Sequence, residues 1–272
     1  MGSVVRLEER LRELGSVLVA FSGGADSAFL LAAAVRTLGA DNVVAATAVS
    51  ASLPASELDA ARAFAGSLGA RHMTPSTDEM ARDGYRANGA DRCFFCKAEL
   101  LDVLAPLART LDLAHVATGT NADDAVAGFR PGIRAAAQRG AVTPLLDAGL
   151  TKSEIRAHSR DWALVTWDKP AAACLSSRIA YGIEVSPFRL SRVERAESDL
   201  RAAFVAAGLA VSNLRVRDVG DVARVEVDAE LIEEVAARSD VLAAITGFSA
   251  VELDPRGFRS GSMNEALAAG AK

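Results

Sequence analysis

Short apolar runs alternate with amphipathic stretches along the first two thirds of the chain. The run Val17 to Phe21 is typical of a buried parallel strand, and the apolar stretch behind it, ending near Leu38, predicts a helix. Further strands are predicted at 42–49, 71–74 and 115–118, and further helices at 4–14, 54–68, 91–109 and 152–160. This alternation predicts an α/β domain, a doubly wound parallel sheet with helices on both faces.

The pattern changes from Phe188 onward. The remaining chain predicts a charged helix at 190–207, strands at 213–218 and 222–228, a helix at 229–245 and a strand near 248–253. This order is typical of a smaller α+β domain. The segment 162–182 before it has no clean periodicity and is expected to begin as a loop. We therefore place the boundary near 183–188, which gives domains 1–185 and 186–272.

The stretch from Ser22 to Ser27 joins the first predicted strand to its helix and has the chemistry of an anion-binding loop. Gly23 and Gly24 lack a Cβ, so backbone N–H groups can approach an anion, and the helix start adds unpaired N–H groups. The serine hydroxyls can donate hydrogen bonds, whereas Asp26 suits the Mg²⁺ that a polyphosphate brings. Neither G-x-x-x-x-G-K-[ST] nor G-x-G-x-x-G is present. The alternative is an ordinary glycine-rich turn.

A second polar segment follows the predicted strand 115–118. Ligands of parallel sheets bind beyond the carboxyl ends of the strands, so this segment and Ser22–Ser27 are expected to face one pocket. Gly119, Asn121 and Asp124 are therefore candidates for that pocket. The alternative is that they are plain turn residues.

Cys93 and Cys96 form a C-x-x-C pair. On a helix these two side chains share one face, so they are core residues or, together with Cys174, ligands of an iron–sulfur cluster. A structural zinc site needs four ligands, and no histidines stand at ligand spacing. Lys97 is a candidate phosphate ligand near the carboxyl edge of the sheet, or else a solvated lysine.

Cys174 is a candidate nucleophile. It lies between Lys169 and Arg178 in a serine-rich segment, and nearby cations favour the reactive thiolate. The alternative is a buried small hydrophobic residue, the usual role of a lone cysteine.

Several arginines are candidate anion ligands. Arg215 and Arg217 stand two residues apart on a predicted strand and point to one face, where paired guanidinium groups suit a phosphate or carboxylate. The alternatives are an exposed charged strand, or pairing with Glu226 and Asp228 on the next strand. Arg130, before Pro131-Gly132, is expected to present a cation on a rigid turn.

Composition narrows the class of protein. The 272 residues are 50% hydrophobic, enough for a large core, and the net charge of −5 disfavours a nucleic-acid surface. Three cysteines favour a reducing, cytoplasmic compartment over a disulfide framework. The N-terminus lacks the apolar core of a signal peptide. Residues 17–35 look superficially like a membrane span, but Asp26 at their centre would cost roughly 2.5–3.5 kcal/mol. We expect a soluble protein with no membrane contact.

Two resemblances sharpen these expectations. Ser22-Gly23-Gly24-x-Asp26-Ser27 after a strand resembles the PP-loop of ATP pyrophosphatases, which split ATP between the α and β phosphates and activate a substrate as its adenylate. Longer motifs resemble the LarE family of ATP-dependent sacrificial sulfur transferases. They are Asp91-Arg92-Cys93-x-x-Cys96-Lys97, Thr120-Asn121-x-Asp123-Asp124, Arg130-Pro131-Gly132, Gly149-Leu150-Thr151-Lys152-x-Glu154-Ile155-Arg156, Trp167-Asp168-Lys169-Pro170-Ala171-x-Ala173-Cys174-Leu175-Ser176-Ser177-Arg178-Ile179 and Gly257-Phe258-Arg259-Ser260-Gly261-Ser262-Met263-Asn264.

The resemblance implies an adenine nucleotide alpha hydrolase-like fold, with ATP and Mg²⁺ as cofactors. The substrate is then a pyridinium-3,5-dicarboxylate mononucleotide, a precursor of the nickel-pincer nucleotide that lactate racemase uses. ATP adenylates a substrate carboxylate, Cys174 attacks it, and elimination leaves a thiocarboxylate on the product and dehydroalanine at position 174.

The resemblance also implies roles for individual residues. Nucleotide binding falls to Ser22, Gly23, Gly24, Asp26, Ser27, Lys97, Gly119, Asn121 and Asp124. Substrate binding falls to Arg130, Ser177, Arg178, Arg215 and Arg217, and Asp26 is the metal ligand. The second domain is expected to bind substrate or to mediate homo-oligomerisation.

Other functions remain open at this stage. A cluster-dependent sulfur transferase would not consume its cysteine, but no second cysteine lies near Cys174 in the chain, which favours the sacrificial route. A tRNA thiolase or an amidotransferase-linked ligase of the PP-loop class is disfavoured by the acidic charge and the lack of an added RNA-binding or glutaminase region. A non-catalytic ATP-binding regulator would leave Cys174 without a role.

Overall fold

The structure, a computed structural model, describes residues 2–128, 130–170, 173–259 and 261–265. Contacts group the chain into two compact units, one formed by Met1–Arg82 with Asp91–Ala172 and the other by Asp83–Ala90 with Ala173–Lys272. Ala171 and Ser260, which contribute to the family resemblance, lie outside the described residues. The domain division expected near 183–188 stays a prediction.

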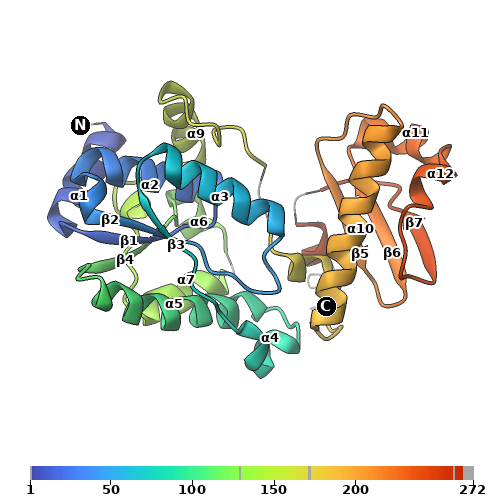
Figure 1. The fold of residues 1–272 in the computed structure, drawn as a ribbon, viewed down its shortest axis with the longest axis horizontal. Coiled ribbons are helices and arrows are strands. Elements are labelled where there is room, and N and C mark those ends of the chain that lie inside the picture. Colours follow the sequence, from blue (N-terminus) through green and yellow to red (C-terminus); the bar gives the residue numbers. More distant parts are fainter. Residues whose placement is uncertain (1, 129, 171–172, 260, 266–272) are drawn as a thin grey trace. The chain divides into compact units, whose positions relative to one another are not determined.

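A parallel sheet of four strands forms the centre of the first unit (Figure 1). The strand order is β3-β2-β1-β4, with bounds Arg71–Met73, Val43–Ala46, Val17–Ala20 and His115–Thr118. Every residue of β1 has a partner in β2 and another in β4, because these strands are short apolar runs that fit between covered faces. The order reverses between β1 and β4, and such a switch point is where ligands of open α/β sheets bind.

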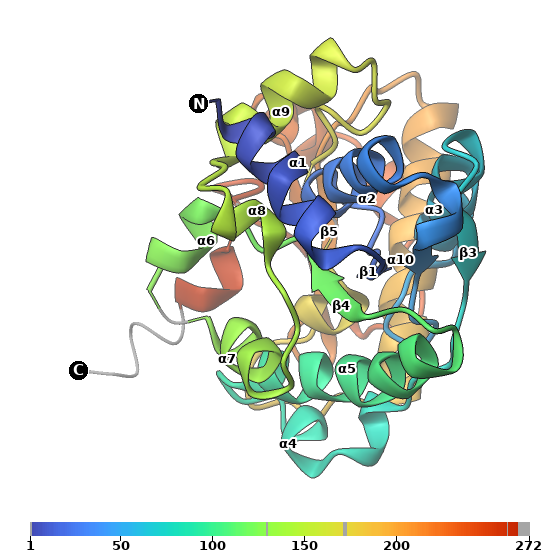
Figure 2. The same ribbon diagram turned by 90° about the vertical axis from the view of Figure 1, so that its left-hand side faces the viewer.

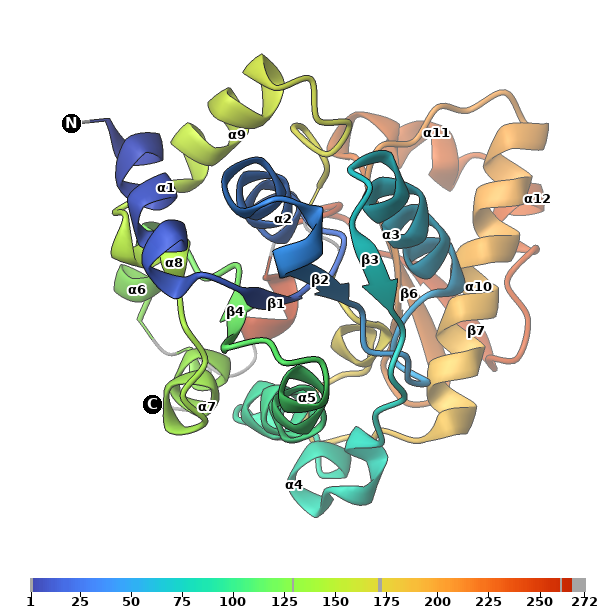
Figure 3. The ribbon, with the colours of Figure 1, turned by 60° about the vertical axis from the view of Figure 1, so that its left-hand side comes forward.

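Helices cover both faces of this sheet (Figures 2 and 3). Val17 and Val19 of β1 face one core, whereas Leu18 and Ala20 face the other. The first core is completed by α1 (Ser3–Leu14), α2 (Ala25–Leu38), α3 (Ala55–Ser67), α8 (Pro144–Asp147) and α9 (Lys152–Asp161), and the second by α5 (Arg92–Thr110) and α7 (Pro131–Gln138). The parallel sheet flanked by helices, predicted from the alternating pattern, is confirmed.

The second unit packs one long helix on a mixed three-stranded sheet (Figure 1). Its elements are α4 (Asp83–Arg86), α10 (Pro187–Ala206), β5 (Leu214–Asp218), β6 (Val222–Val227), α11 (Ile232–Ala236), α12 (Ser239–Leu242) and β7 (Ala250–Leu253). Strand β6 pairs antiparallel with β5 and parallel with β7. Leu200 and Phe204 of α10 are fully buried with Leu214 and Val225. The single helix expected over 229–245 is broken into a 3₁₀ turn, α11 and α12, because the chain leaves helical geometry at Arg238.

Asn88 fixes the short segment 83–90 to the second unit. Its side chain is completely buried, and Nδ2 donates to the carbonyl oxygens of Ile179, Ala180 and Ile183 at 3.3, 2.8 and 2.8 Å. Its φ of +54° is one that asparagine tolerates better than most residues.

The remaining regular segments are α6 (Ala122–Val126) and 3₁₀ helices at Ala40–Asn42, Glu79–Ala81, Leu175–Arg178, Ala229–Leu231 and Ser262–Asn264. Among the described residues, no helix is both long and apolar enough to span a bilayer.

Candidate active site

The Ser22–Ser27 loop is held in shape by its own side chains. Gly23 has a φ of +72°, a left-handed conformation that favours glycine. The Ser27 hydroxyl donates to the Gly24 carbonyl oxygen at 3.1 Å and accepts from the Ser22 amide at 3.3 Å. The loop leads directly into α2, a helix of 14 residues whose N-terminal N–H groups and dipole attract anions. This geometry suits an anion cradle.

Gly119, at the end of β4, lies directly against the start of α2. A Cβ on Gly119 would sit 2.9 Å from the Ser27 backbone nitrogen, closer than real Cβ atoms come, and a tight 3.2 Å from the Asp26 carbonyl carbon. The missing side chain therefore lets the loops after β1 and β4 meet at the switch point of the sheet.

Asp26, in the first turn of α2, has one carboxylate oxygen that accepts a hydrogen bond and one that has no partner among the described residues. Asn121 Nδ2 donates to Oδ2 at 3.2 Å, and Lys152 Nζ lies 3.8 Å from the same atom. The other oxygen, Oδ1, is buried and has no hydrogen-bond partner among the described residues. Burial raises the pKa of Asp26, and the nearby Asp124 carboxylate raises it further, whereas Lys152 and Asn121 oppose the rise.

A divalent cation would complete this arrangement. Mg²⁺ bound with a nucleotide takes one or two protein carboxylates, and phosphate oxygens and water supply its other ligands. Asp26, with its unpaired buried oxygen, fits the first position, and Asp124 is the carboxylate close enough to act electrostatically on it. In the part of the chain that the structure describes, no group of three or more His, Cys, Asp or Glu side chains is placed to hold a metal by itself.

The chain after β4 forms two helices, α6 and α7, so the alternative of plain turn residues does not describe it. Asn121 caps α6, because its side chain accepts from the Asp124 amide at 3.0 Å and Asp124 accepts from the Asn121 amide at 3.4 Å. Arg130 does not sit on a rigid turn but is the residue before α7, which Pro131 begins. Its guanidinium lies 3.5 Å from the Asp124 carboxylate, which also acts on Asp26.

Two lysines that were not predicted as nucleotide ligands contact the Ser22–Ser27 loop region. Lys169 Nζ donates to the Gly23 carbonyl oxygen at 3.0 Å and pairs with Glu57 at 2.7 Å. Lys152 is the ammonium beside Asp26. Arg156 fixes the backbone near Lys169 by donating to its carbonyl oxygen at 2.9 Å. Lysine spacing contains no signal for these contacts, which arise only when α9 and the following loop pack beside β1 and α2.

Cys93 and Cys96 lie in the first turns of α5, as their helical spacing predicts. The interpretation of both as core residues is wrong, because Cys93 is exposed and Cys96 is only partly buried. Burial lowers the pKa of the adjacent Lys97, and the two cysteines oppose that shift. The assignment of Lys97 to phosphate stays a prediction.

Cys174 stands just before the 3₁₀ helix Leu175–Arg178 and is partly buried. Its Sγ lies 2.9 Å from the Ser176 hydroxyl, and its carbonyl oxygen accepts from the Ser177 hydroxyl at 2.7 Å. Arg178 is buried and pairs with Glu197, so its charge is directed to that carboxylate and to backbone carbonyls. The alternative of a fully buried small hydrophobic residue does not apply to Cys174.

Arg215 and Arg217 are buried in the second unit, so the alternative of an exposed charged strand is wrong. Arg217 pairs with Glu226 at 2.6 Å, as one alternative predicted. Asp228 instead accepts from the backbone amides of 212 and 213 at 2.7 and 3.0 Å. Burial, reinforced by the like charges of Arg178 and Arg217, lowers the pKa of Arg215 to about 10. Guanidinium groups gathered in one buried cluster suit an anionic ligand.

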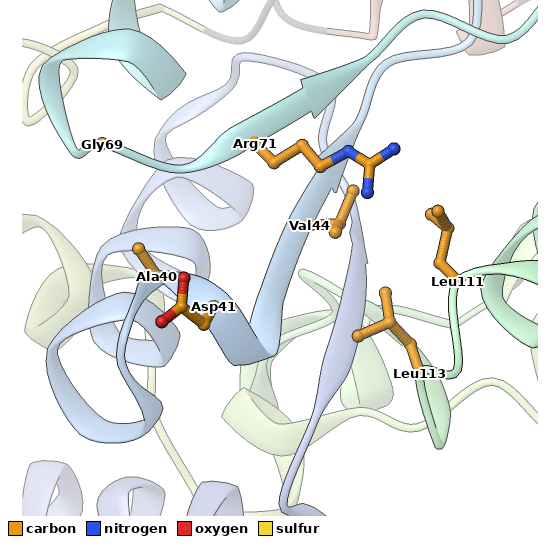
Figure 4. Close-up of a pocket in the computed structure, with 7 residues that line it drawn as sticks. All are labelled: Ala40, Asp41, Val44, Gly69, Arg71, Leu111 and Leu113. Atoms are coloured by element: carbon orange, nitrogen blue, oxygen red, sulfur yellow. The ribbon is translucent and has the colours of Figure 1, made fainter.

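A pocket at the amino ends of the strands of the first sheet is not part of this site (Figure 4). It is lined by residues that precede or begin β2, β3 and β4, namely Ala40, Asp41, Val44, Gly69, Arg71, Leu111 and Leu113. These are the amino ends of the strands, whereas ligands of such sheets bind beyond the carboxyl ends.

Comparison with known proteins gives two relatives over nearly the whole chain. An uncharacterized protein of Synechocystis is 41% identical over 266 residues, which are 96% of each chain. The pyridinium-3,5-bisthiocarboxylic acid mononucleotide synthase of Lactiplantibacillus plantarum is 34% identical over 260 residues, which are 94% of this chain and 92% of the synthase. An uncharacterized protein of Methanocaldococcus jannaschii is 26% identical over 155 residues, 57% of this chain and 58% of its own. No protein-family model matches the chain.

The fold defines the class: an α/β protein compatible with the PP-loop fold, with a glycine-containing loop before α2 at the switch point of a parallel sheet. The extent of the match to the Lactiplantibacillus synthase then gives the family. The chain belongs to the LarE family, the family of pyridinium-3,5-bisthiocarboxylic acid mononucleotide synthases.

Gly119→Ala tests the close approach of the two loops. The new Cβ would meet the Ser27 backbone, so we expect a loss of about 1–3 kcal/mol in the free energy of unfolding and weaker nucleotide binding. The matched control is Gly66→Ala in α3, where a Cβ meets nothing within 4 Å. Denaturant unfolding and calorimetric titration with ATP measure both effects, and equal behaviour of the two variants would contradict this contact.

Asp26→Asn tests the unpaired carboxylate. A carboxyl group whose pKa is raised by folding stabilises the fold below its unfolded pKa of about 4, and that stabilisation is lost as the pH rises through the folded value. We therefore expect the nucleotide-free variant to have a higher Tm than wild type at pH 7, with the difference shrinking toward pH 4. Pyrophosphate release should be lost. A variant that melts below wild type at pH 7, or that releases pyrophosphate normally, would refute the assignment.

Proposed function

We propose that this chain transfers the sulfur of its own Cys174 to an adenylated carboxylate of a pyridinium-3,5-dicarboxylate mononucleotide, in nickel-pincer cofactor biosynthesis. The observation that carries the proposal is the near full-length match to a relative whose name states a bisthiocarboxylic acid mononucleotide as its product. The loop of Ser22–Ser27 and the placement of Cys174 among hydrogen-bonding groups support it.

The first step is activation of the acceptor. A substrate carboxylate oxygen attacks the α-phosphate of ATP, pyrophosphate leaves, and an acyl adenylate forms. The amides and hydroxyls of Ser22, Gly23, Gly24 and Ser27 would hold phosphate oxygens, and Asn121 keeps the Asp26 carboxylate oriented. Mg²⁺, held by Asp26 when bound, would neutralise charge on the leaving pyrophosphate. Lys169 and Lys152 add positive charge beside the loop.

The second step forms the carbon–sulfur bond. The Cys174 thiolate attacks the acyl carbon, AMP leaves, and a thioester joins the acceptor to the protein. Loss of the Cys174 α-proton and cleavage of its Cβ–S bond then release a thiocarboxylate and leave dehydroalanine. An acyl-bound sulfur leaves Cβ more readily than a plain thiolate, because the thiocarboxylate delocalises its charge. Two such rounds, on two chains, give the bisthiocarboxylate.

The second unit supplies a site for the acceptor's phosphate. Burial and, after it, the like charges of Arg178 and Arg217 lower the pKa of Arg215, and a phosphate beside it would oppose that repulsion. Arg217 already pairs with Glu226 and would contribute through its remaining donors. Lys97, Arg130, Ser177 and Arg178 as ligands, homo-oligomerisation and a cytoplasmic location stay predictions.

Cys174→Ser separates the two steps. The variant should still release pyrophosphate in the presence of acceptor, because the Ser22–Ser27 loop is unchanged, but should transfer no sulfur. Cys93→Ala and Cys96→Ala are the matched controls and should transfer nearly normally. The assay measures pyrophosphate and thiocarboxylated mononucleotide in the same reaction.

Sulfur-transfer and nucleotide assays also distinguish this proposal from a cluster-dependent enzyme, a tRNA thiolase and a non-catalytic regulator. Loss of sulfur transfer in all three cysteine variants would favour a cluster-dependent enzyme. Sulfur recovered in RNA would favour a tRNA thiolase, and nucleotide binding without pyrophosphate release would favour a regulator. Each of these results contradicts the proposal.

A further inference from the structure

The carbonyl oxygen of Cys174 accepts three hydrogen bonds. The Ser177 amide donates at 3.0 Å, which is the ordinary bond of a 3₁₀ turn. The Ser177 hydroxyl donates at 2.7 Å and Arg178 Nη1 at 3.2 Å, and neither bond is required by the turn. Three donors, one of them cationic, therefore surround a single backbone oxygen of the sulfur-donating residue.

The cationic donor is fixed and shielded from water. Arg178 is 4% exposed, and its Nε and Nη2 donate to the Glu197 carboxylate at 2.9 and 3.1 Å. Glu197 is held in turn by the Val216 amide at 3.1 Å. A charge-assisted hydrogen bond in a buried site is stronger than one in water and needs no rearrangement when charge develops.

Elimination of sulfur develops negative charge at this oxygen. When the Cys174 α-proton leaves, its electron pair delocalises onto the adjacent carbonyl, which becomes an enolate oxygen. The pair then forms the Cα=Cβ bond, and the electrons of the Cβ–S bond leave with sulfur. The proton goes to hydroxide from solvent, which gives water, and the products are dehydroalanine and a thiocarboxylate.

We propose that Ser177 and Arg178 form an oxyanion hole for the protein's own backbone and stabilise the enolate of residue 174 during elimination. The inference rests on the proposed function, since only a reaction that cleaves Cβ–S needs this enolate. It differs from the expectation that these two residues bind substrate, because both donate to the carbonyl oxygen of Cys174; Arg178 Nη1 also donates to the Ala173 carbonyl oxygen at 2.5 Å.

A chemical elimination isolates this step from ATP and acceptor. The probe 2,5-dibromohexanediamide alkylates a cysteine twice to a cyclic sulfonium, which loses an α-proton to base and gives dehydroalanine. Mass spectrometry of peptides follows decay of the sulfonium, and so reports elimination and not alkylation. We expect the sulfonium at residue 174 to decay faster than those at Cys93 and Cys96 in the same folded chain, with a rate that rises with pH.

Variants of Ser177 test the hydroxyl directly. Removal of one oxyanion-type donor slows a reaction by on the order of 10²-fold, so Ser177→Ala should slow decay by about that factor, whereas Ser177→Thr should keep the fast rate. The matched control is Ser67→Ala, which removes a hydroxyl bond to the carbonyl of Phe64 with the same length of 2.7 Å and the same spacing. It should leave the rate at residue 174 unchanged.

Equal decay at the three cysteines of the wild-type chain, or equal decay in Ser177→Ala and wild type, would overturn the oxyanion hole. Should Ser177→Ala not fold, the wild-type comparison still decides. With ATP, Mg²⁺ and the dicarboxylate mononucleotide, Ser177→Ala should accumulate the covalent acceptor adduct. If the wild-type chain never forms that adduct, the proposed function fails, whereas the sulfonium rates report on the carbonyl alone.

Discussion

The contact between Gly119 and the first turn of α2 is the constraint on which the first unit's site depends. It brings the loop after β4 against the loop after β1, and only a residue without a side chain permits this distance. Asn121 can then reach Asp26, and Asp124 and Lys152 act on the same carboxylate. The anion loop, the candidate metal ligand and the surrounding charges thus follow from one backbone approach at the switch point of the sheet.

The second unit buries three arginines, Arg178, Arg215 and Arg217, close enough to act on one another electrostatically. Arg178 and Arg217 each pair with a glutamate, and burial together with the like charges of these two arginines lowers the pKa of Arg215. Arg178 pairs with Glu197 and also donates to the backbone of Cys174, so one buried side chain links α10 to the sulfur-bearing residue.

The elements with strong periodicity could be predicted from the sequence, and those without it could not. The apolar run at β1 and the long helices α2 and α5 were within about two residues of their observed bounds. Helices α6 and α7 were missed because they are short, although Asn121-x-x-Asp124 has capping-box spacing and Pro131 suits a first helical position.

For the candidate site, residue types alone predict the Ser22–Ser27 loop and Cys174, because glycines, serines and a carboxylate in that order suit an anion and its metal ion, and a cysteine among cations suits a nucleophile. Contacts between residues far apart in the chain could not be predicted, because no local sequence pattern indicates them. Lys169 reaches Gly23 across more than a hundred residues of chain, and the exposure of Cys93 depends on what covers α5.

The most direct test of the central claim is the intact mass of the chain, with peptide mapping, after reaction with ATP, Mg²⁺ and the dicarboxylate mononucleotide. The account predicts a chain lighter by one H₂S, with the loss at residue 174 and one sulfur in product per chain. Continued turnover with an unchanged Cys174 would contradict it.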